Sequence, residues 1–363
     1  MMRILMTADA IGGVWQYATD LAEALTPLGV ETLLTVLGPS PDDAQREQVA
    51  AMPGVTLVDT GLPLDWLCDG PAPMIAAGRA VAALARRERV DLVQANMPTL
   101  AAGGDISQPV VAVAHGCIGT WWRAAHGEVP GHRYAWLDAM NRVGLQAADV
   151  VVAPSASHAD AVMRHHALEV APLVVHNGRA PLPLPADVPS TDAVFTAGRL
   201  WDLVKETPLL DRVAARLPVP FRAAGAVMGP HGERADIAYL KALGQLGPDG
   251  LARELAARPI FVSAARFEPF GLAVLEAAQA GCPLILSNID TFRELWTGAA
   301  LLVEEDEDAF VAAIERVRGD AGLRAHLSEA ARLRAQRYTP VATAGAMAAL
   351  YAGLVTPSAK VAA

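Results

Sequence analysis

The sequence predicts an α/β protein of two tandem domains, each with an open, mostly parallel sheet covered by helices on both faces. Short apolar runs alternate with stretches of helical periodicity along most of the chain. A proline-rich stretch interrupts this alternation near the middle, and the pattern then starts again. The length of 363 residues also fits two domains of ordinary size.

In the first half, several of the predicted strands are continuous apolar runs typical of strands buried on both faces of a parallel sheet. The predicted strands cover residues 3–9, 30–38, 55–60, 90–96, 109–116, 148–155 and 171–178. Residues 12–29 begin with Gly12 and Gly13 and then carry apolar residues at helical spacing, which predicts a helix. Gly29 is a suitable residue to end that helix.

The interruption at residues 179–190 contains four prolines and predicts a linker. We therefore expect a first domain at 1–178, a linker at 179–191 and a second domain at 192–340. Residues 341–363 are expected to form a final helix that packs back toward the first domain. The second domain has predicted strands at 193–199, 220–226, 257–264 and 282–288, and predicted helices at 207–217, 248–257, 271–281 and 307–319.

Composition excludes several classes of function. The net charge is −10, and neither half of the chain is basic, so a nucleic-acid partner is not expected. The acidic balance also argues against docking on anionic lipid. No apolar run has the length of a membrane span, and the N-terminus reads as a strand and turn rather than a signal peptide. Three scattered cysteines without a CxxC pair predict a reduced, cytoplasmic chain, with peripheral attachment at the inner membrane left open.

The stretch FEPFGLAVLEA at residues 267–277 holds two glutamates eight positions apart. We expect a helix from about Phe270 to Gln279, with Glu268 in the loop before it. The free N–H groups near Gly271 and Leu272 would then form an anion site.

Glu276 lies beside the apolar face of the same predicted helix, where a carboxylate needs partners. The vicinal hydroxyls of a ribose are suitable partners, so the stretch predicts a nucleotide-sugar site. Taken alone, the stretch fits a simpler interpretation equally well. In that interpretation the helix dipole favours the charge of Glu268, and Glu276 belongs to a solvated helix face.

The motif E-P-F-G-L-x-x-L-E, followed by A-G-x-P-L-I, resembles the signature of retaining glycosyltransferases of the family 4 type. The resemblance extends to residues 174–178, 195–205 and 287–295 and to the N-terminal glycines and helix. It implies the GT-B fold, with two Rossmann-like domains and a donor bound in an interdomain cleft.

The resemblance also implies roles for particular residues. Arg199 and Lys205, in a Gly-Arg-Leu-x-x-x-x-Lys stretch, would neutralise the departing diphosphate, and Glu268 would orient the sugar. Gly12 and Gly13 would line the cleft, although an ordinary tight turn explains the pair about as well. His115 would lie near the transferred sugar, with a core histidine as the alternative. The full donor set is expected to be Gly12, Gly13, Arg199, Lys205, Glu268, Phe270, Gly271, Leu272 and Glu276.

Other signals have simpler interpretations. The DxD string at 306–308 precedes a predicted helix, so helix capping is favoured over a metal site. His126, His132, His165 and His166 lack metal-ligand spacing and are expected at the surface. The irregular aromatic stretch 121–136 fits an acceptor pocket or ordinary packing. Glu206 could pair with Lys205 and weaken its hold on phosphate.

These observations together predict a cytoplasmic, metal-independent retaining glycosyltransferase that needs no cofactor. Its donor would be a UDP-, GDP- or ADP-linked sugar, and its acceptor a saccharide, a glycolipid or a small molecule. Another enzyme of the same fold, such as a sugar-nucleotide epimerase or a glycan phosphorylase, is an alternative, as is a non-catalytic nucleotide-sugar binder. The nucleotide base, the sugar, the acceptor and the oligomeric state are left open.

Overall fold

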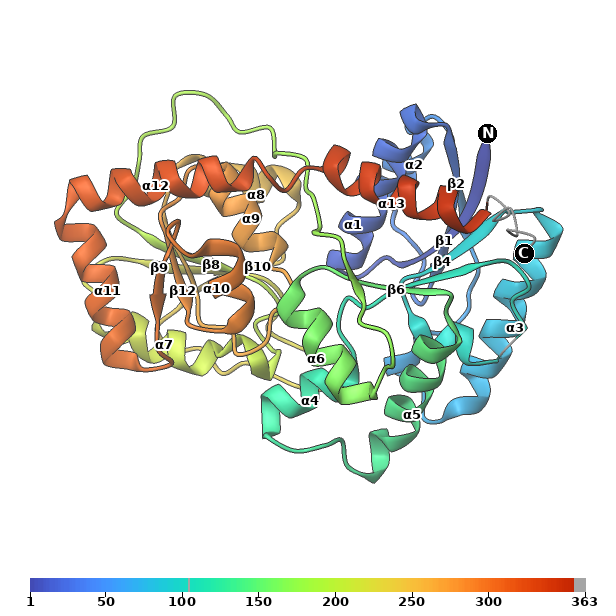
Figure 1. Cartoon of the computed structure of the whole chain (residues 1–363). Coiled ribbons are helices and arrows are strands. Elements are labelled where there is room, and N and C mark those ends of the chain that lie inside the picture. The colour runs from blue at the N-terminus through green and yellow to red at the C-terminus, as the bar shows by residue number, and fades with distance from the viewer. Residues whose placement is uncertain (104, 356–363) are drawn as a thin grey trace, which may run out of the picture. The chain divides into compact units, whose positions relative to one another are not determined.

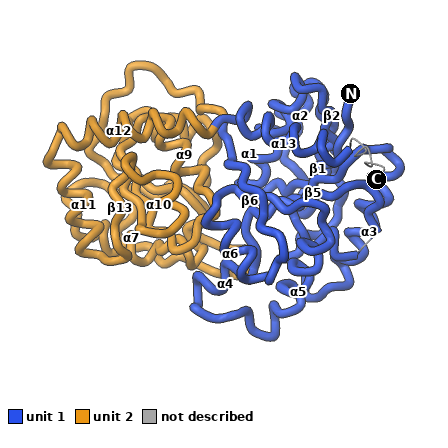
Figure 2. The backbone as a smooth tube through the Cα atoms, viewed as in Figure 1, with its two compact units in different colours: residues 1–179, 339–363 blue, residues 180–338 orange. Residues whose placement is uncertain are grey.

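The computed structural model describes residues 1–103 and 105–355, and the chain divides into two compact units. Unit 1 contains Met1–Arg179 and Thr339–Ala363, and unit 2 contains Ala180–Tyr338 (Figure 2). Residues 180–190 contain no helix or strand. The division into units does not test the predicted cleft between the domains, which stays a prediction.

Within the described residues, unit 1 has a seven-stranded parallel sheet in the order β3-β2-β1-β4-β5-β6-β7. The strands are β1 (Met2–Asp9), β2 (Val30–Leu37), β3 (Val55–Asp59), β4 (Leu92–Ala95), β5 (Val110–Val113), β6 (Val150–Ala153) and β7 (Leu173–Val174). The α-helices are α1 (Gly13–Leu25), α2 (Asp43–Ala50), α3 (Pro71–Arg87), α4 (Ile118–His126), α5 (His132–Ala147), α6 (Ala156–His166) and α13 (Pro340–Val355). Short 3-10 helices are η1 (Thr26–Leu28), η2 (Asp65–Leu67) and η3 (Pro98–Gly103).

Alternate residues of the central strand β1 face opposite sides of this sheet. Ile4 and Met6 pack in one cluster with α1 and α13, whereas Leu5 packs in another with α3. Helix α13 lies against α1 and covers the same face, so the last helix of the described chain belongs to the core of unit 1 (Figure 1). Burial on both faces explains why a central strand such as β5, with the sequence VVAV, is a continuous apolar run.

Unit 2 has a six-stranded parallel sheet in the order β10-β9-β8-β11-β12-β13, within the part of the chain that is described. The strands are β8 (Val194–Ala197), β9 (Phe221–Ala224), β10 (Lys241–Gly244), β11 (Ile260–Ser263), β12 (Leu284–Ser287) and β13 (Leu301–Val303). The helices are η4 (Leu203–Lys205), α7 (Thr207–Arg216), α8 (Pro248–Ala256), α9 (Leu272–Gln279), α10 (Asp290–Trp296), α11 (Glu307–Gly319) and α12 (Ala321–Ala335). Neighbouring residues of β8 again divide between two cores: Val194 packs with α7 and α11, and Phe195 packs with α9 and α10.

Both sheets reverse their strand order beside the first strand of the unit, which is the order of a Rossmann-like sheet. The reversal falls between β1 and β4 in unit 1 and between β8 and β11 in unit 2. Ligands of such sheets bind at the carboxyl ends of the strands beside this switch point. The predicted α/β class, with mostly parallel sheets and helices on both faces, is confirmed.

Local structure differs from the sequence prediction in several places, and the helices α10 and α12 were not among the predicted ones. The predictions missed β10 and β13, which are short strands at the two edges of the unit 2 sheet. The predicted strand at 171–178 pairs only over Leu173–Val174. Helix α9 begins at Leu272 rather than near Phe270, because Gly271 takes a left-handed conformation before it. The stretch 121–136 is not irregular: most of it lies in α4 and α5.

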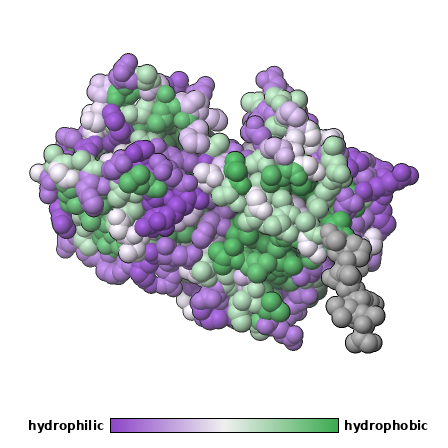
Figure 3. All heavy atoms as spheres, turned by 45° about the horizontal axis from the view of Figure 1, so that its top comes forward, coloured by the Kyte–Doolittle hydropathy of each residue, from purple (hydrophilic) through white to green (hydrophobic). Residues whose placement is uncertain are grey.

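One stretch, residues 321–355, is long and apolar enough to cross a membrane by length and composition alone. It consists of α12 and α13, which have 15 and 16 residues and are separated at residues 336–339. Each helix is shorter than the roughly 20 residues that span a bilayer. Hydrophobic residues reach the surface in several places on one face of the molecule (Figure 3), and Val341 of α13 is 74% exposed.

Candidate active site

The candidate residues of unit 2 gather at the switch point of its sheet. Arg199 and Lys205 follow β8, and Glu268 follows the neighbouring strand β11. Because β8 and β11 are parallel and adjacent, the loops after both strands leave the same edge of the sheet. This is the place where a doubly wound sheet binds its ligand.

The ammonium of Lys205 forms an ion pair with the carboxylate of Glu268. The distance from Nζ to Oε2 is 2.6 Å, and each side chain keeps about a fifth of its surface exposed, 20% for Lys205 and 19% for Glu268. Loss of one partner from a partly buried pair leaves the other charge poorly solvated. The pair therefore joins the loops after β8 and β11 and keeps a positive and a negative group at the switch point.

Asp202 holds the two cations of the β8 loop in place. Its side chain is 2% exposed, and its carboxylate pairs with the Nη2 of Arg199 at 2.7 Å. The same side chain caps η4, the single turn that ends at Lys205. The Arg199 side chain stays 61% exposed, with its guanidinium carbon 5.7 Å from the centre of the Trp201 ring. Sequence reasoning missed Asp202, although an aspartate before a short turn is a common capping signal.

Glu206 does not pair with Lys205, so that expectation was wrong. Its carboxylate contacts the Nε of Arg266 at 2.8 Å. Arg266 comes from the loop after β11, and its backbone N–H donates to the carbonyl of Val204 at 2.9 Å, which brings the guanidinium to Glu206. Burial raises the pKa of Glu206, and the positive charge of Arg266 lowers it in part. Lys205 therefore pairs with Glu268, and Glu206 pairs with Arg266.

The N-terminus of α9 lies directly after Glu268. Gly271 precedes the helix with φ of 94°, a left-handed conformation in which most side chains are strained. A Cβ at this position would lie 3.3 Å from the Cγ of Glu268 and 3.4 Å from Phe292. Glycine therefore lets the loop turn tightly into α9, whose first N–H groups can receive an anion.

The other predicted donor residues of unit 2 differ in their exposure. Phe270 is 3% exposed and packs edge-on against Tyr338, with ring centres 5.4 Å apart. It can offer a ligand only its backbone. Leu272 and Glu276 are both half-buried, one turn apart on α9.

The glycines Gly12 and Gly13 of unit 1 lie at its own switch point, after β1. Gly12 precedes α1 and is exposed, and a Cβ there would meet no atom within 4 Å. Packing within unit 1 therefore does not require glycine at this position. Open space beside the backbone is compatible with close approach of a ligand.

His115 lies two residues beyond β5 and is held by its neighbours. Its Nε2 is 3.1 Å from the Oδ1 of Asn96, and its ring meets Tyr17 edge-on at 4.5 Å. The amide nitrogen of Asn96 donates to the carbonyl of Thr7 at 2.7 Å, so Oδ1 faces His115 and Nε2 carries the proton. Burial, with a smaller contribution from nearby His158, lowers the pKa of His115 to about 3. The imidazole is thus neutral at physiological pH.

A chain of buried polar groups leads from His115 to the last helix. The amide of Gln94 donates to Asn96 Oδ1 at 3.0 Å, and the hydroxyl of Tyr351 on α13 donates to Gln94 Oε1. Gln94 and Tyr351 are fully buried. Sequence reasoning missed this network, because its members are far apart in the chain and no local pattern marks them.

The other sequence signals have mixed outcomes. Asp306 caps α11 by accepting from the N–H of Ala309 at 2.8 Å, so the predicted capping role is confirmed. His126 and His132 are exposed, as predicted. The surface prediction for the other two histidines was wrong: His166 is fully buried, and the side chain of His165 is 5% exposed.

Sequence comparison decides the family. Residues 11–180 match Glycosyltransferase Family 4, and residues 238–334 match Glycosyl transferases group 1. The two ranges together cover more than two thirds of the chain. The chain belongs to the family 4 type of glycosyltransferases. No curated protein sequence matches this glycosyltransferase.

Solved structures of glycosyltransferases share the fold. A sucrose-phosphate synthase from Thermosynechococcus elongatus is 20% identical, with a TM-score of 0.79 over 99% of this chain and 100% of that one. The Anabaena protein HepE, solved in complex with UDP-glucose, is 19% identical, with a TM-score of 0.72 over 98% and 100%. A glycosyltransferase from Rickettsia africae is 15% identical, with a TM-score of 0.71 over 98% and 99%. The GT-B fold expected from the resemblance is confirmed.

Proposed function

We propose that this glycosyltransferase moves a sugar from a nucleoside diphosphate sugar to an acceptor hydroxyl, without a metal ion in the transfer step and with retention of anomeric configuration. The observation that carries the proposal is the Lys205–Glu268 ion pair at the switch point of unit 2. A charged pair beside a helix N-terminus suits a ligand that carries both phosphate and sugar hydroxyls.

The donor would bind along the loops after β8 and β11. Its diphosphate would take the exposed guanidinium of Arg199, the ammonium of Lys205 and the first N–H groups of α9. The freed carboxylate of Glu268 would accept hydrogen bonds from the sugar, and Glu276 would accept them from the ribose. On this view Glu268 holds Lys205 in position until a diphosphate replaces it as the partner.

The transfer step breaks the bond between the anomeric carbon and the diphosphate oxygen and forms a bond to the acceptor oxygen. Negative charge grows on the leaving diphosphate, and Arg199 and Lys205 stabilise it more in the transition state than in the ground state. We favour attack from the face that the leaving group departs from, with a donor phosphate oxygen taking the acceptor proton. The neutral imidazole of His115, whose Nε2–H faces Asn96, would accept a hydrogen bond at Nδ1 rather than supply charge.

The nucleotide base is the least defined part of the donor. HepE was solved with UDP, with UDP and glucose, and with UDP-glucose, and a pneumococcal O-GlcNAc transferase of similar fold was solved with UDP and GlcNAc. These likenesses favour a UDP-sugar as the first donor to try, before GDP- and ADP-sugars.

The test begins with a thermal-shift screen of UDP, GDP and ADP, followed by incubation of the matching sugar nucleotides with a panel of saccharide acceptors. We expect one nucleoside diphosphate to stabilise the protein and its sugar nucleotide to yield a glycoside whose anomeric configuration, read by NMR, equals that of the donor. An inverted product would refute retention, and loss of transfer after chelation, with the protein still folded, would refute metal independence. Binding without product for every acceptor would favour the non-catalytic alternative.

A further inference from the structure

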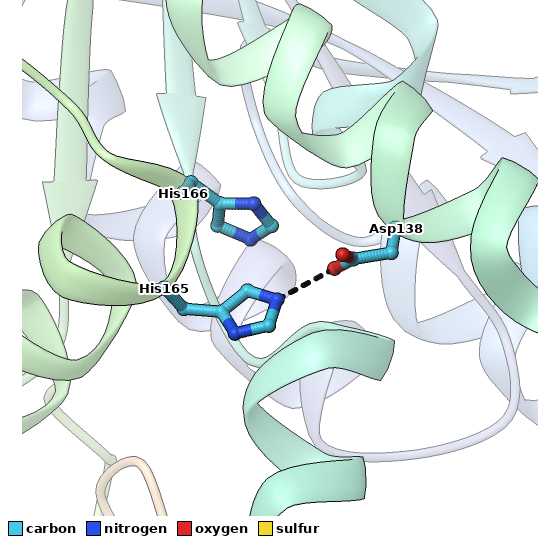
Figure 4. Close-up of side chains that lie close together, drawn as sticks. All are labelled: Asp138, His165 and His166. Atoms are coloured by element: carbon cyan, nitrogen blue, oxygen red, sulfur yellow. Dashed lines mark hydrogen bonds and ion pairs between the residues drawn. The ribbon is translucent and has the colours of Figure 1, made fainter. Parts of the chain in front are cut away.

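Unit 1 contains a cluster of ionisable side chains that the proposed transfer reaction does not use. Asp138 lies on α5, and His165 and His166 end α6 (Figure 4). One nitrogen or oxygen atom from each of the three lies within 4.8 Å of the others. The Nε2 of His165 is 2.7 Å from the Oδ1 of Asp138.

Cys117 adds a sulfur atom to this cluster from a third helix. It is the N-cap residue of α4, and its Sγ lies 3.2 Å from the Nε2 of His166. Two imidazoles and one carboxylate thus come together from α5 and α6, and a thiol from α4 contacts one of the imidazoles. These are the ligand types that zinc prefers, whereas calcium and magnesium favour sites made of oxygen atoms alone.

Gly119 lets α4 approach the same atoms. A Cβ at this position would lie 2.0 Å from the Nε2 of His165 and 2.3 Å from the Oδ1 of Asp138, which no real side chain allows. The backbone of α4 therefore packs directly on the two atoms that would face an ion. A residue larger than glycine would push the His165–Asp138 pair away from this point.

The imidazole of His166, which contacts Cys117 through Nε2, is fully buried. Burial, together with the neighbouring His165, lowers the pKa of His166 to about 4. A neutral imidazole is the form that binds a metal ion.

We propose that Asp138, His165, His166 and Cys117 bind one zinc ion, which links α4, α5 and α6. Ligand atoms of a tetrahedral zinc ion lie about 3.3 to 3.8 Å apart, since its bonds measure about 2.0 to 2.3 Å. The atoms of Asp138, His165 and His166 lie within 4.8 Å of one another, and the Sγ of Cys117 lies 3.2 Å from the Nε2 of His166, so side-chain rotation would have to bring the sulfur to the same point. Zinc would replace the hydrogen bonds between His165 and Asp138 and between Cys117 and His166, and the thiol proton of Cys117 would leave to solvent. Four protein ligands leave no open position, so the ion has a structural role and takes no part in sugar transfer.

The first test uses the purified full-length chain after treatment with a chelator and removal of the chelator. Titration with zinc chloride, followed by calorimetry, should give one ion per chain with a Kd below about 1 µM. Cobalt(II) in the same site should give the visible absorption of a tetrahedral complex and a thiolate-to-metal band in the near ultraviolet. No binding at one ion per chain in the folded wild-type protein would overturn the proposal.

Variants then test the ligand set. Asp138→Asn keeps the shape of the side chain and should weaken zinc binding by more than about 100-fold. Loss of a residue that only hydrogen-bonds to a metal ligand typically weakens binding by about 10- to 100-fold. Cys117→Ser should abolish the thiolate-to-cobalt band. His132→Ala is the matched control, because His132 is exposed and lies on the same helix as Asp138. Equal weakening by His132→Ala and Asp138→Asn would refute this site.

A third readout separates this proposal from the proposed function. Asp138→Asn should lower the thermal stability that added zinc confers, and it should leave the rate of glycosyl transfer unchanged at a temperature where the variant is folded. If a variant does not fold, the wild-type titration and cobalt spectrum decide alone. Failure to bind zinc would leave the proposed transfer reaction untouched, and failure to transfer sugar would leave the zinc proposal untouched.

Discussion

The two units share one sheet topology and differ in the chemistry at its switch point. In unit 2, the loops after β8 and β11 carry Arg199, Lys205 and Glu268, all with part of their surface exposed. In unit 1, the corresponding region carries the carboxylate of Asp9, which ends β1, and a buried hydrogen-bonded network of neutral groups, including Gln94 and Asn96, that reaches His115. The topology therefore defines where a ligand can bind, and the side chains after each strand decide whether the place suits a diphosphate or an uncharged group.

The largest effect is expected from a change to the charged groups at the switch point of unit 2. Lys205→Ala should slow transfer by about 100- to 1000-fold, because the leaving diphosphate loses a cation that acts mainly in the transition state. The measurement is kcat with a saturating donor. Lys241→Ala is the control, since Lys241 is an exposed lysine of the same unit. Equal rates for Lys205→Ala and wild type would remove Lys205 from the reaction.

A buried neutral histidine of unit 1, His158 on α6, predicts that the stability of the folded state depends on pH. Burial lowers the pKa of His158 to about 4, and the ordinary value in an unfolded chain is about 6.5. The folded state thus binds fewer protons than the unfolded state between these values, so the stability from neutral His158 is complete above pH 6.5 and is lost as the pH falls toward 4. The loss should be about 3 kcal/mol.

Urea unfolding at several pH values, with a chelator present to exclude metal effects, measures this slope. His158→Gln, which cannot titrate, should flatten the decline between pH 6.5 and 4. His326→Gln, a change at an exposed histidine of unit 2, should leave the slope as it is. An unchanged slope in His158→Gln would show that His158 does not resist protonation in the folded state.

A variant of Glu276 tests whether this residue of unit 2 acts in nucleotide binding rather than in the transfer step. Glu276→Ala should weaken binding of the nucleoside diphosphate by about 10- to 100-fold, because charge-assisted hydrogen bonds contribute about 1.5 to 3 kcal/mol. Calorimetric titration measures the Kd, and Glu329→Ala, at a glutamate of α12 that pairs with Arg332, is the control. A loss in kcat with an unchanged Kd would place Glu276 in the transfer step instead.

The smallest effect concerns the network of unit 1. Tyr351→Phe removes the hydroxyl that donates to Gln94 and should lower the free energy of unfolding by about 1 kcal/mol. Denaturant titration measures the change, and Tyr239→Phe, at a tyrosine that is 65% exposed, should have no effect. Full stability in Tyr351→Phe would mean that the network is not anchored by α13.

Much of the fold could be predicted from local pattern. The apolar runs of β5 and β12 are typical of strands buried on both faces, and they form such strands. The edge strand β10 (KALG) lacks such a run, and the strand β13 (LLV) is only three residues long, so the sequence analysis did not identify them. The position of Glu268 before α9 followed from Pro269 and Gly271, residues whose backbone preferences act locally.

Pairing between distant side chains could not be predicted in the same way. Sequence reasoning considered Glu206 as the partner of Lys205, because the two are adjacent in the chain. Glu268, 63 positions away, is the partner in the structure, and Arg266 takes Glu206. The adjacent histidines His165 and His166 carry no recognisable spacing, and only the packing of α4, α5 and α6 brings them to Cys117 and Asp138.

The sequence by itself determined the alternation of strands and helices, the family and the residue types that could meet a diphosphate. These features depend on periodicity, on proline and glycine, and on short motifs, all of which act between neighbours in the chain. Tertiary structure alone decided which carboxylate faces Lys205, which histidines are buried and which helices meet at Cys117. Strand pairing and helix packing place such groups together from far apart in the chain, and ion pairs, burial and metal coordination depend on distances in space.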